Sequence, residues 1–259
     1  MSVVVNCRFL SVCILVVTPF LNLVAQEFEQ LPIDDSAQID SAKGDQFSGW
    51  ERSALFGYNL SRGNSDNSLF NIRAKINYDG LKDVASFEAE TNYGKDEEET
   101  NEDSSRASAG YRRLLTKHTF LGFSSLFERD QLAALKYRVS LNPSVGRYLV
   151  RTPELRWLVE AGPSYVFEEL GDQTDDYLAP RVGQRLEATV TDTTKVFQEV
   201  YSTWQSSDNY LLTAQAGIDV AINSFLGLVL TVRNDYDSSP AEDKKNNDFS
   251  MISSIRTSF

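Results

Sequence analysis

Polar and apolar residues alternate with a period of two along most of this chain, from Trp50 to the last residue. In the clearest segment, residues 70–78, the even positions are apolar and the odd positions are polar. This alternation is typical of β-strands, because successive side chains of a strand point to opposite faces. Here the polar face carries fixed charges, and Tyr78 ends the apolar face, as the aromatic girdle of a membrane barrel does.

The same alternation recurs in eight further segments: 85–93, 106–112, 135–145, 156–167, 181–190, 210–220, 226–236 and 249–259. Three segments with less distinct faces complete the set: 50–61, 119–130 and 195–206. Single-chain bacterial barrels have an even number of strands, and only a closed ladder pairs every backbone group in lipid. The sequence therefore predicts an all-β fold, a transmembrane up-and-down antiparallel β-barrel of about twelve strands.

The connections between these segments provide a second test. With the N-terminus in the periplasm, the three longest connections, 95–103, 171–176 and 238–247, all fall on the extracellular side, where long loops are expected. A soluble β-sandwich, the structural alternative, has no reason to sort its loops by length. Pro143 and Pro163 lie inside predicted strands and predict a bulge or kink there.

The first 25 residues differ from the rest. They hold one charge, Arg8, and an apolar run that ends before Ala25, which predicts a secretory signal peptide over residues 1–25. An uncleaved helical anchor is the alternative, although a proline and an asparagine interrupt the apolar run. The polar, acidic residues 26–49 predict a periplasmic linker, and residues 50–259 the outer-membrane β-barrel.

Composition excludes several functions. Both cysteines, Cys7 and Cys13, lie in the predicted signal peptide, so the exported chain is expected to have no disulfide, no thiol chemistry and no cysteine metal site. The chain carries 25 basic and 37 acidic residues, which argues against a nucleic-acid partner. We expect outer-membrane lipid and lipopolysaccharide as its surroundings, and no cofactor. The sequence leaves the oligomeric state open.

Charged side chains on the polar faces cannot face hydrocarbon, where a basic group costs about 2–4 kcal/mol at the midplane. They are therefore predicted to line the lumen: Arg73, Lys75, Glu88, Glu90, Arg106, Arg112, Lys136, Arg138, Arg156, Glu160, Arg181, Arg185, Glu187, Asp219, Arg233, Asp235 and Arg256. A continuous basic track would form a narrow, anion-favouring channel for small solutes or ions. A cross-paired network would instead fill the lumen and give a closed structural or envelope-stress barrel.

An outer-membrane lipid-modifying enzyme is the third function considered. The only histidine, His118, falls in a predicted periplasmic turn beside Lys117. It cannot act there as the base of an active site near the outer rim. No catalytic or metal-binding residue is expected.

Four groups of residues carry a resemblance to a known family. They are Trp50 with residues 57–65, the pair Arg129-Asp130, residues 162–166 and residues 236–241. Together, in this order, they resemble the YdiY-like family of salt-induced outer-membrane proteins, a domain of unknown function. The step Gly63-Asn64-Ser65 is the most specific part. The resemblance implies an outer-membrane barrel and supplies no reaction or ligand.

The C-terminal residue is Phe259, and it follows an alternating apolar stripe. It resembles the terminal signal read by the outer-membrane assembly machinery, which is therefore an expected partner. The simpler interpretation is that Phe259 is the last aromatic of the girdle.

Overall fold

The structure, a computed structural model, describes residues 49–62, 67–96 and 99–259. These residues form twelve β-strands: β1 (Gly49–Arg62), β2 (Asn67–Asp79), β3 (Asp83–Asp96), β4 (Glu99–Leu114), β5 (Thr119–Asp130), β6 (Leu135–Arg151), β7 (Leu155–Leu170), β8 (Gln173–Thr191), β9 (Thr194–Trp204), β10 (Tyr210–Ala221), β11 (Leu226–Asp237) and β12 (Asn247–Ser258). The predicted signal peptide and nearly all of the predicted linker lie outside the described residues.

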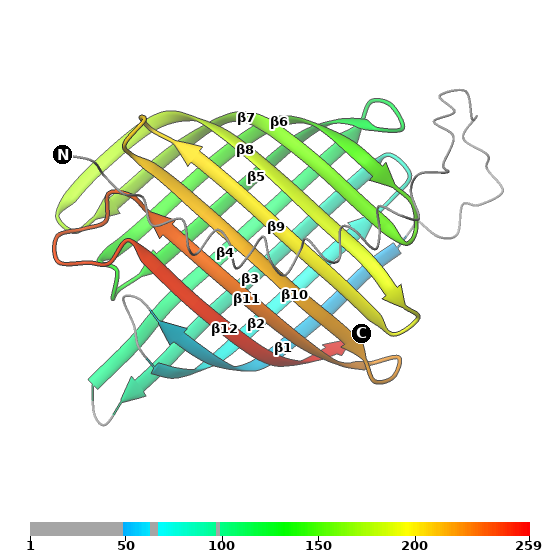
Figure 1. The fold of residues 1–259 in the computed structure, drawn as a ribbon, viewed down its shortest axis with the longest axis horizontal. Coiled ribbons are helices and arrows are strands. Elements are labelled where there is room, and N and C mark those ends of the chain that lie inside the picture. The colour runs from blue at the N-terminus through cyan, green and yellow to red at the C-terminus, as the bar shows by residue number, and fades with distance from the viewer. Residues whose placement is uncertain (1–48, 63–66, 97–98) are drawn as a thin grey trace, which may run out of the picture. The chain divides into compact units, whose positions relative to one another are not determined.

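The strands close into a single barrel (Figure 1). Each strand pairs antiparallel with the next one in the sequence, and β1 pairs with β12 from Ser53↔Ser258 to Arg62↔Phe249. This arrangement confirms the predicted all-β, up-and-down antiparallel barrel. Among the described residues, no helix has the length and hydropathy that a membrane-spanning helix requires.

The outer face of the barrel is apolar in the middle and aromatic at both ends. Ile72 and Phe87 on neighbouring strands are exposed. Trp50 and Tyr78 contact each other at the end with the short turns, with ring centroids 5.1 Å apart. Tyr210 and Tyr236 stack at 5.5 Å near the opposite end, which carries the loop between β11 and β12. An apolar band between two aromatic girdles is the surface of a transmembrane barrel.

Two of the three predicted long loops are instead strands. The segment 95–103 is largely taken up by the ends of β3 and β4, and 171–176 shrinks to a hairpin turn at Gly171 and Asp172. The acidic residues of these two segments made them look like loops. A strand end can be charged, however, where it extends beyond the lipid. Only the connection 238–246 is long, so the predicted sorting of loop lengths is much weaker than expected.

No bulge is found at Pro143 and Pro163, where a bulge or kink was expected, but the ladder has no partners between Leu141↔Tyr165 and Val145↔Ala161. The pairing of β6 with β7 has the same register on both sides of these prolines, and its shifts lie at Leu135/Tyr137 and Tyr148/Val150. A third proline, Pro180, is the register partner of Pro163, and all three are exposed. Gly162 explains the regular register, since a Cβ there would lie 2.1 Å from the Pro143 carbonyl oxygen. Without a side chain, the two strands approach closely enough to stay in register.

Candidate functional site

The interior of the barrel is crossed by ion pairs. Two strands that are not neighbours in a closed barrel can meet only through its interior, so such a pair must span the lumen. Besides Arg256–Asp219 (2.9 Å), which only passes over β11 between β12 and β10, there are four of these pairs among the described residues: Arg106–Asp235 (3.7 Å), Arg138–Asp237 (3.2 Å), Arg112–Glu160 (3.8 Å) and Arg156–Asp79 (2.5 Å). They join β4 to β11, β6 to β11, β4 to β7 and β7 to β2. The lumen is therefore spanned at several levels along the barrel axis.

A row of alternating charge runs around half of the wall. From β2 to β7, directly paired positions on successive strands are basic and acidic in turn: Arg73, Glu90, Arg106, Glu128, Arg138 and Glu168. We call these six residues the charge belt. Each basic residue of the belt forms an ion pair with the acid that follows it. Opposite charges at cross-strand positions stabilise a sheet, and two of the belt arginines also cross the lumen to β11.

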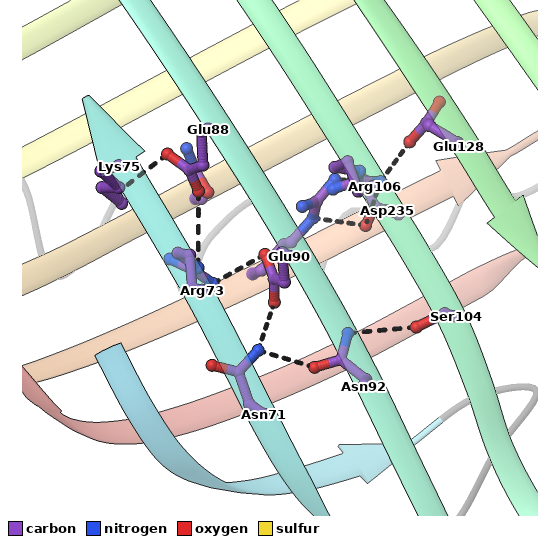
Figure 2. Close-up of polar contacts among 12 residues, drawn as sticks. Asn71, Arg73, Lys75, Glu88, Glu90, Asn92, Ser104, Arg106, Glu128 and Asp235 are labelled. Atoms are coloured by element: carbon purple, nitrogen blue, oxygen red, sulfur yellow. Dashed lines mark hydrogen bonds and ion pairs between the residues drawn. The ribbon is translucent and has the colours of Figure 1, made fainter. Parts of the chain in front are cut away.

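Arg73 is the most enclosed cation of the belt, with a side chain 5 % exposed. Figure 2 shows it between two carboxylates, 2.9 Å from Glu90 and 3.4 Å from Glu88. Glu90 also accepts a hydrogen bond of 2.7 Å from Asn71 Nδ2. Asn71 in turn donates to Asn92, at 2.8 Å. A buried charge is tolerated when it is paired and hydrogen-bonded in this way.

A second group of charges lies nearer the short turns, on β7, β8 and β9. Glu160 is shared by Arg112 and by Arg181, which lies at 3.3 Å. The guanidinium of Arg181 also stacks over the ring of Tyr201, at 3.8 Å from its centroid. Arg185 contacts Glu187 at 2.5 Å and a further acid, Glu199, at 3.8 Å. Neither sign of charge dominates this level of the lumen.

A cavity of about 200 Å³ lies at the end of the barrel that carries the β11–β12 loop. Charges of the belt and of β11 contribute to its lining, among them Arg106, Glu128 and Asp235. Leu135 and Leu211 contribute an apolar part of the wall. The cavity forms a small vestibule, and the cross-lumen pairs Arg106–Asp235 and Arg138–Asp237 are part of its lining.

An apolar cluster occupies the opposite end of the interior. Leu114, Phe120, Tyr148 and Leu158 pack together there, and Phe120 has no exposed surface. Gly146 makes room for the Phe120 ring, because a Cβ at that position would lie 2.1 Å from it. The interior is thus polar at the vestibule and carries an apolar cluster from β4 to β7 at the opposite end.

Sixteen of the seventeen residues predicted to line the lumen take part in the interior ion pairs. Lys136 is the exception. It lies next to the register shift at Leu135/Tyr137, its side chain is 55 % exposed, and it pairs with Glu169 and Asp172 at the rim. The extra residue in β6 turns Lys136 away from the position that strict alternation predicts.

Sequence reasoning missed five interior acids: Asp79, Glu128, Glu168, Glu199 and Asp237. Three of them lie just beyond the predicted segment ends, and two lie in segments whose faces were not distinct. With them, the ion-paired interior holds ten basic and eleven acidic residues. The ion-paired part of the interior is thus close to charge-balanced, which gives no support to the predicted excess of basic side chains.

His118 lies in the turn between β4 and β5, where its carbonyl oxygen accepts a hydrogen bond of 2.7 Å from the Tyr148 amide. It is not among the residues of the charged interior. In the described ranges, no group of three or more His, Cys, Asp and Glu side chains is arranged to hold a metal ion.

Comparison with known proteins places the chain in a family and supports the fold. Residues 54–259 match the family described as "Protein of unknown function, DUF481". No curated protein sequence matches. Among solved structures, the NanC porin is similar with a TM-score of 0.52 and 9% identity, over 79% of this chain and 98% of that one. Outer membrane phospholipase A from Escherichia coli gives 0.50 and 11%, over 80% and 92%. At these identities the likeness concerns the fold alone.

Proposed function

The chain belongs to the DUF481 family of proteins of unknown function, and we propose that it is an outer-membrane barrel that forms a narrow channel for ions and small solutes. Its apolar outer face with aromatic ends and its charged interior support the location in a membrane. The N-terminus lies in the periplasm in this proposal, so the β11–β12 loop and the vestibule face the outside of the cell.

The observation that carries the proposal is the partial exposure of charges inside the lumen. The side chains of Lys75, Arg185, Glu187 and Asp235 are 28–38% exposed although they point into the barrel. Charged groups with this much accessible surface contact water, which supports a hydrated path past the ion pairs. If the interior side chains served only to stabilise a closed barrel, charges would bring little advantage, because apolar residues of similar volume are often as stabilising as buried ion pairs.

The cross-lumen pairs make this channel narrow and only weakly selective. Arg106–Asp235 and Arg138–Asp237 cross the lumen, so ions must pass around these paired side chains. Because the interior charges are balanced, neither anions nor cations meet an uncompensated ring of charge. The expectation of an anion-selective pore, which rested on a basic track, is therefore replaced by one of weak selectivity.

Single-channel recording of the purified full-length protein in planar bilayers tests the proposal. We expect small, discrete conductance steps and, under a salt gradient, a reversal potential close to zero. Protein that shows the heat-dependent gel shift of a folded barrel but no conductance steps would contradict the channel. A strongly anion-selective current would contradict the balanced lumen.

A closed structural barrel is the second candidate. It is favoured by the apolar cluster around Phe120, which occupies part of one end of the interior. In that case the ion pairs only stabilise the wall. Substituting Phe120 by Ala separates the two functions, since a channel should conduct more after this end of the lumen is widened and a closed barrel should only lose stability.

A further inference from the structure

A chain of polar side chains crosses the outer face of the barrel, where apolar residues are expected. The Trp157 indole donates a hydrogen bond of 3.1 Å to Gln184 Oε1, and Gln184 Nε2 donates one of 3.1 Å to Gln198 Oε1. Arg185 follows Gln184 and Glu199 follows Gln198 in the sequence. Arg185 and Glu199 pair with each other inside the barrel, so the two glutamines lie on the opposite face of their strands. The amides of β8 and β9 therefore point outward.

These amides lie at membrane depth. Gln198 is the fifth of the eleven residues of β9, and Gln184 is well inside β8. A transmembrane β-strand needs about 9–11 residues, so the middle of β9 lies within the hydrocarbon if the barrel spans a membrane. Gln198 accepts through Oε1, but its Nε2 has no acceptor among the described residues. Lipid chains supply none, and an unsatisfied polar group in hydrocarbon is unfavourable.

β9 differs from the other strands in a second respect. Throughout the described part of the chain, every other strand contributes at least one exposed large apolar side chain, and β9 contributes none. Its outward residues around Gln198 are Val196, Val200 and Ser202, and the outward partners on β10 include Ala214 and Ala216. Trp204, at the far end of β9, also points outward, so the lipid-facing surface is low and partly polar around Gln198.

We propose that the outer face of β8 and β9 is the interface through which two copies of this barrel associate in the membrane. The inference rests on the membrane location proposed above but not on conduction. Two copies inserted in the same direction are related by a two-fold axis along the membrane normal, so a residue near the axis meets itself at the same depth. A glutamine amide is both donor and acceptor. Gln198 Nε2 of each copy then finds its acceptor on the other copy.

Disulfide cross-linking in isolated outer membranes tests this proposal on the full-length chain. Cys7 and Cys13 are first replaced by Ala, and a single cysteine is then placed at Val200, beside Gln198 on the same face. The matched control carries its cysteine at Ala109, an exposed outward position on β4. After mild oxidation, we expect a disulfide-linked dimer from Val200→Cys and monomer from Ala109→Cys. Equal dimer yields from both positions, or none from either, would overturn the proposal.

A second substitution tests whether the Gln198 amide holds the two copies together. Added to Val200→Cys, Gln198→Leu should lower the cross-linked fraction about fivefold, the range expected for a polar contact in a membrane. Thr91→Val, which removes an outward polar group on β3, should leave it unchanged. A heat-dependent gel shift in each variant shows that the barrel is folded. A cross-linked product that contains a protein of another mass would identify a different partner and contradict self-association. Loss of conductance in a variant that still cross-links would contradict the proposed channel but not the dimer.

Discussion

Arg106 on β4 lies 3.7 Å from Asp235 on β11, although six strands in one direction and four in the other lie between them around the barrel. Arg106 also pairs with Glu128 on the neighbouring strand β5. Figure 2 shows this arginine between the two carboxylates. One guanidinium thus connects the charge belt on the wall to the opposite side of the lumen. Both residues line the vestibule and their contact crosses the lumen, so this pair is a candidate for a polar constriction there.

Neutralising Asp235 should give the channel an anion preference. Asp235 is shared by Arg106 and by Arg233, which lies at 2.6 Å, so Asp235→Asn leaves two interior guanidiniums with less negative charge beside them. We expect the reversal potential under a salt gradient to shift toward that of anions. Asp83→Asn is the control, because Asp83 pairs with the exposed Arg113 at a strand end and should not affect the current.

Removing Arg73 should destabilise the barrel strongly. Arg73→Gln leaves Glu88 and Glu90 close together in the interior without their shared cation. Breaking a buried pair of this kind costs about 3–5 kcal/mol. Lys75→Gln removes a more exposed contact to the same Glu88 and should cost less than about 1 kcal/mol. Urea unfolding in detergent micelles measures both, and equal losses would show that Arg73 has no special role.

Filling the space above Phe120 should also be unfavourable. In Gly146→Ala the new Cβ would lie 2.1 Å from the ring, so the ring or the strand must move. Overpacking of this kind costs about 1–3 kcal/mol. Replacing Phe120 by Leu in the same variant should recover part of the loss, since the two sites are in contact. Additive losses in the double variant would contradict this packing.

The turn between β7 and β8 provides a test of backbone strain alone. Gly171 has a φ of +61°, and a Cβ there would meet nothing within 4 Å. Gly171→Ala should cost about 1–2 kcal/mol through the left-handed conformation. Gly49 also has free space but no positive φ, so Gly49→Ala should be nearly neutral. If both variants unfold at the same urea concentration, the strain is absent.

The sequence pattern was sufficient for the fold because a barrel wall has one apolar and one polar face. Alternation placed Arg73, Glu90 and Arg106 on the same side, and the structure brings these three into the charge belt. It failed where the alternation itself shifts. At Lys136 the extra residue of β6 moves the side chain to the rim, and no residue type in the sequence marks that shift.

The balance of charge in the lumen was harder to predict than its location. Glu168 and Asp237 lie at strand ends that continue beyond the apolar pattern, and both pair with Arg138. A strand can continue outside the lipid without any apolar residue, so hydropathy does not mark its end. Partners such as Arg112 and Glu160, three strands apart, depend on the curvature of the closed barrel and have no signature in the sequence.

The conductance of Arg106→Gln/Asp235→Asn, compared with that of the wild-type protein in the same planar bilayers, tests the central claim most directly. The two changes remove the charges of one cross-lumen pair while keeping side chains of similar size. If paired charges constrict a hydrated lumen, the single-channel conductance should rise in the double variant. An unchanged conductance, or no conductance steps from either protein although each is folded, would contradict this account.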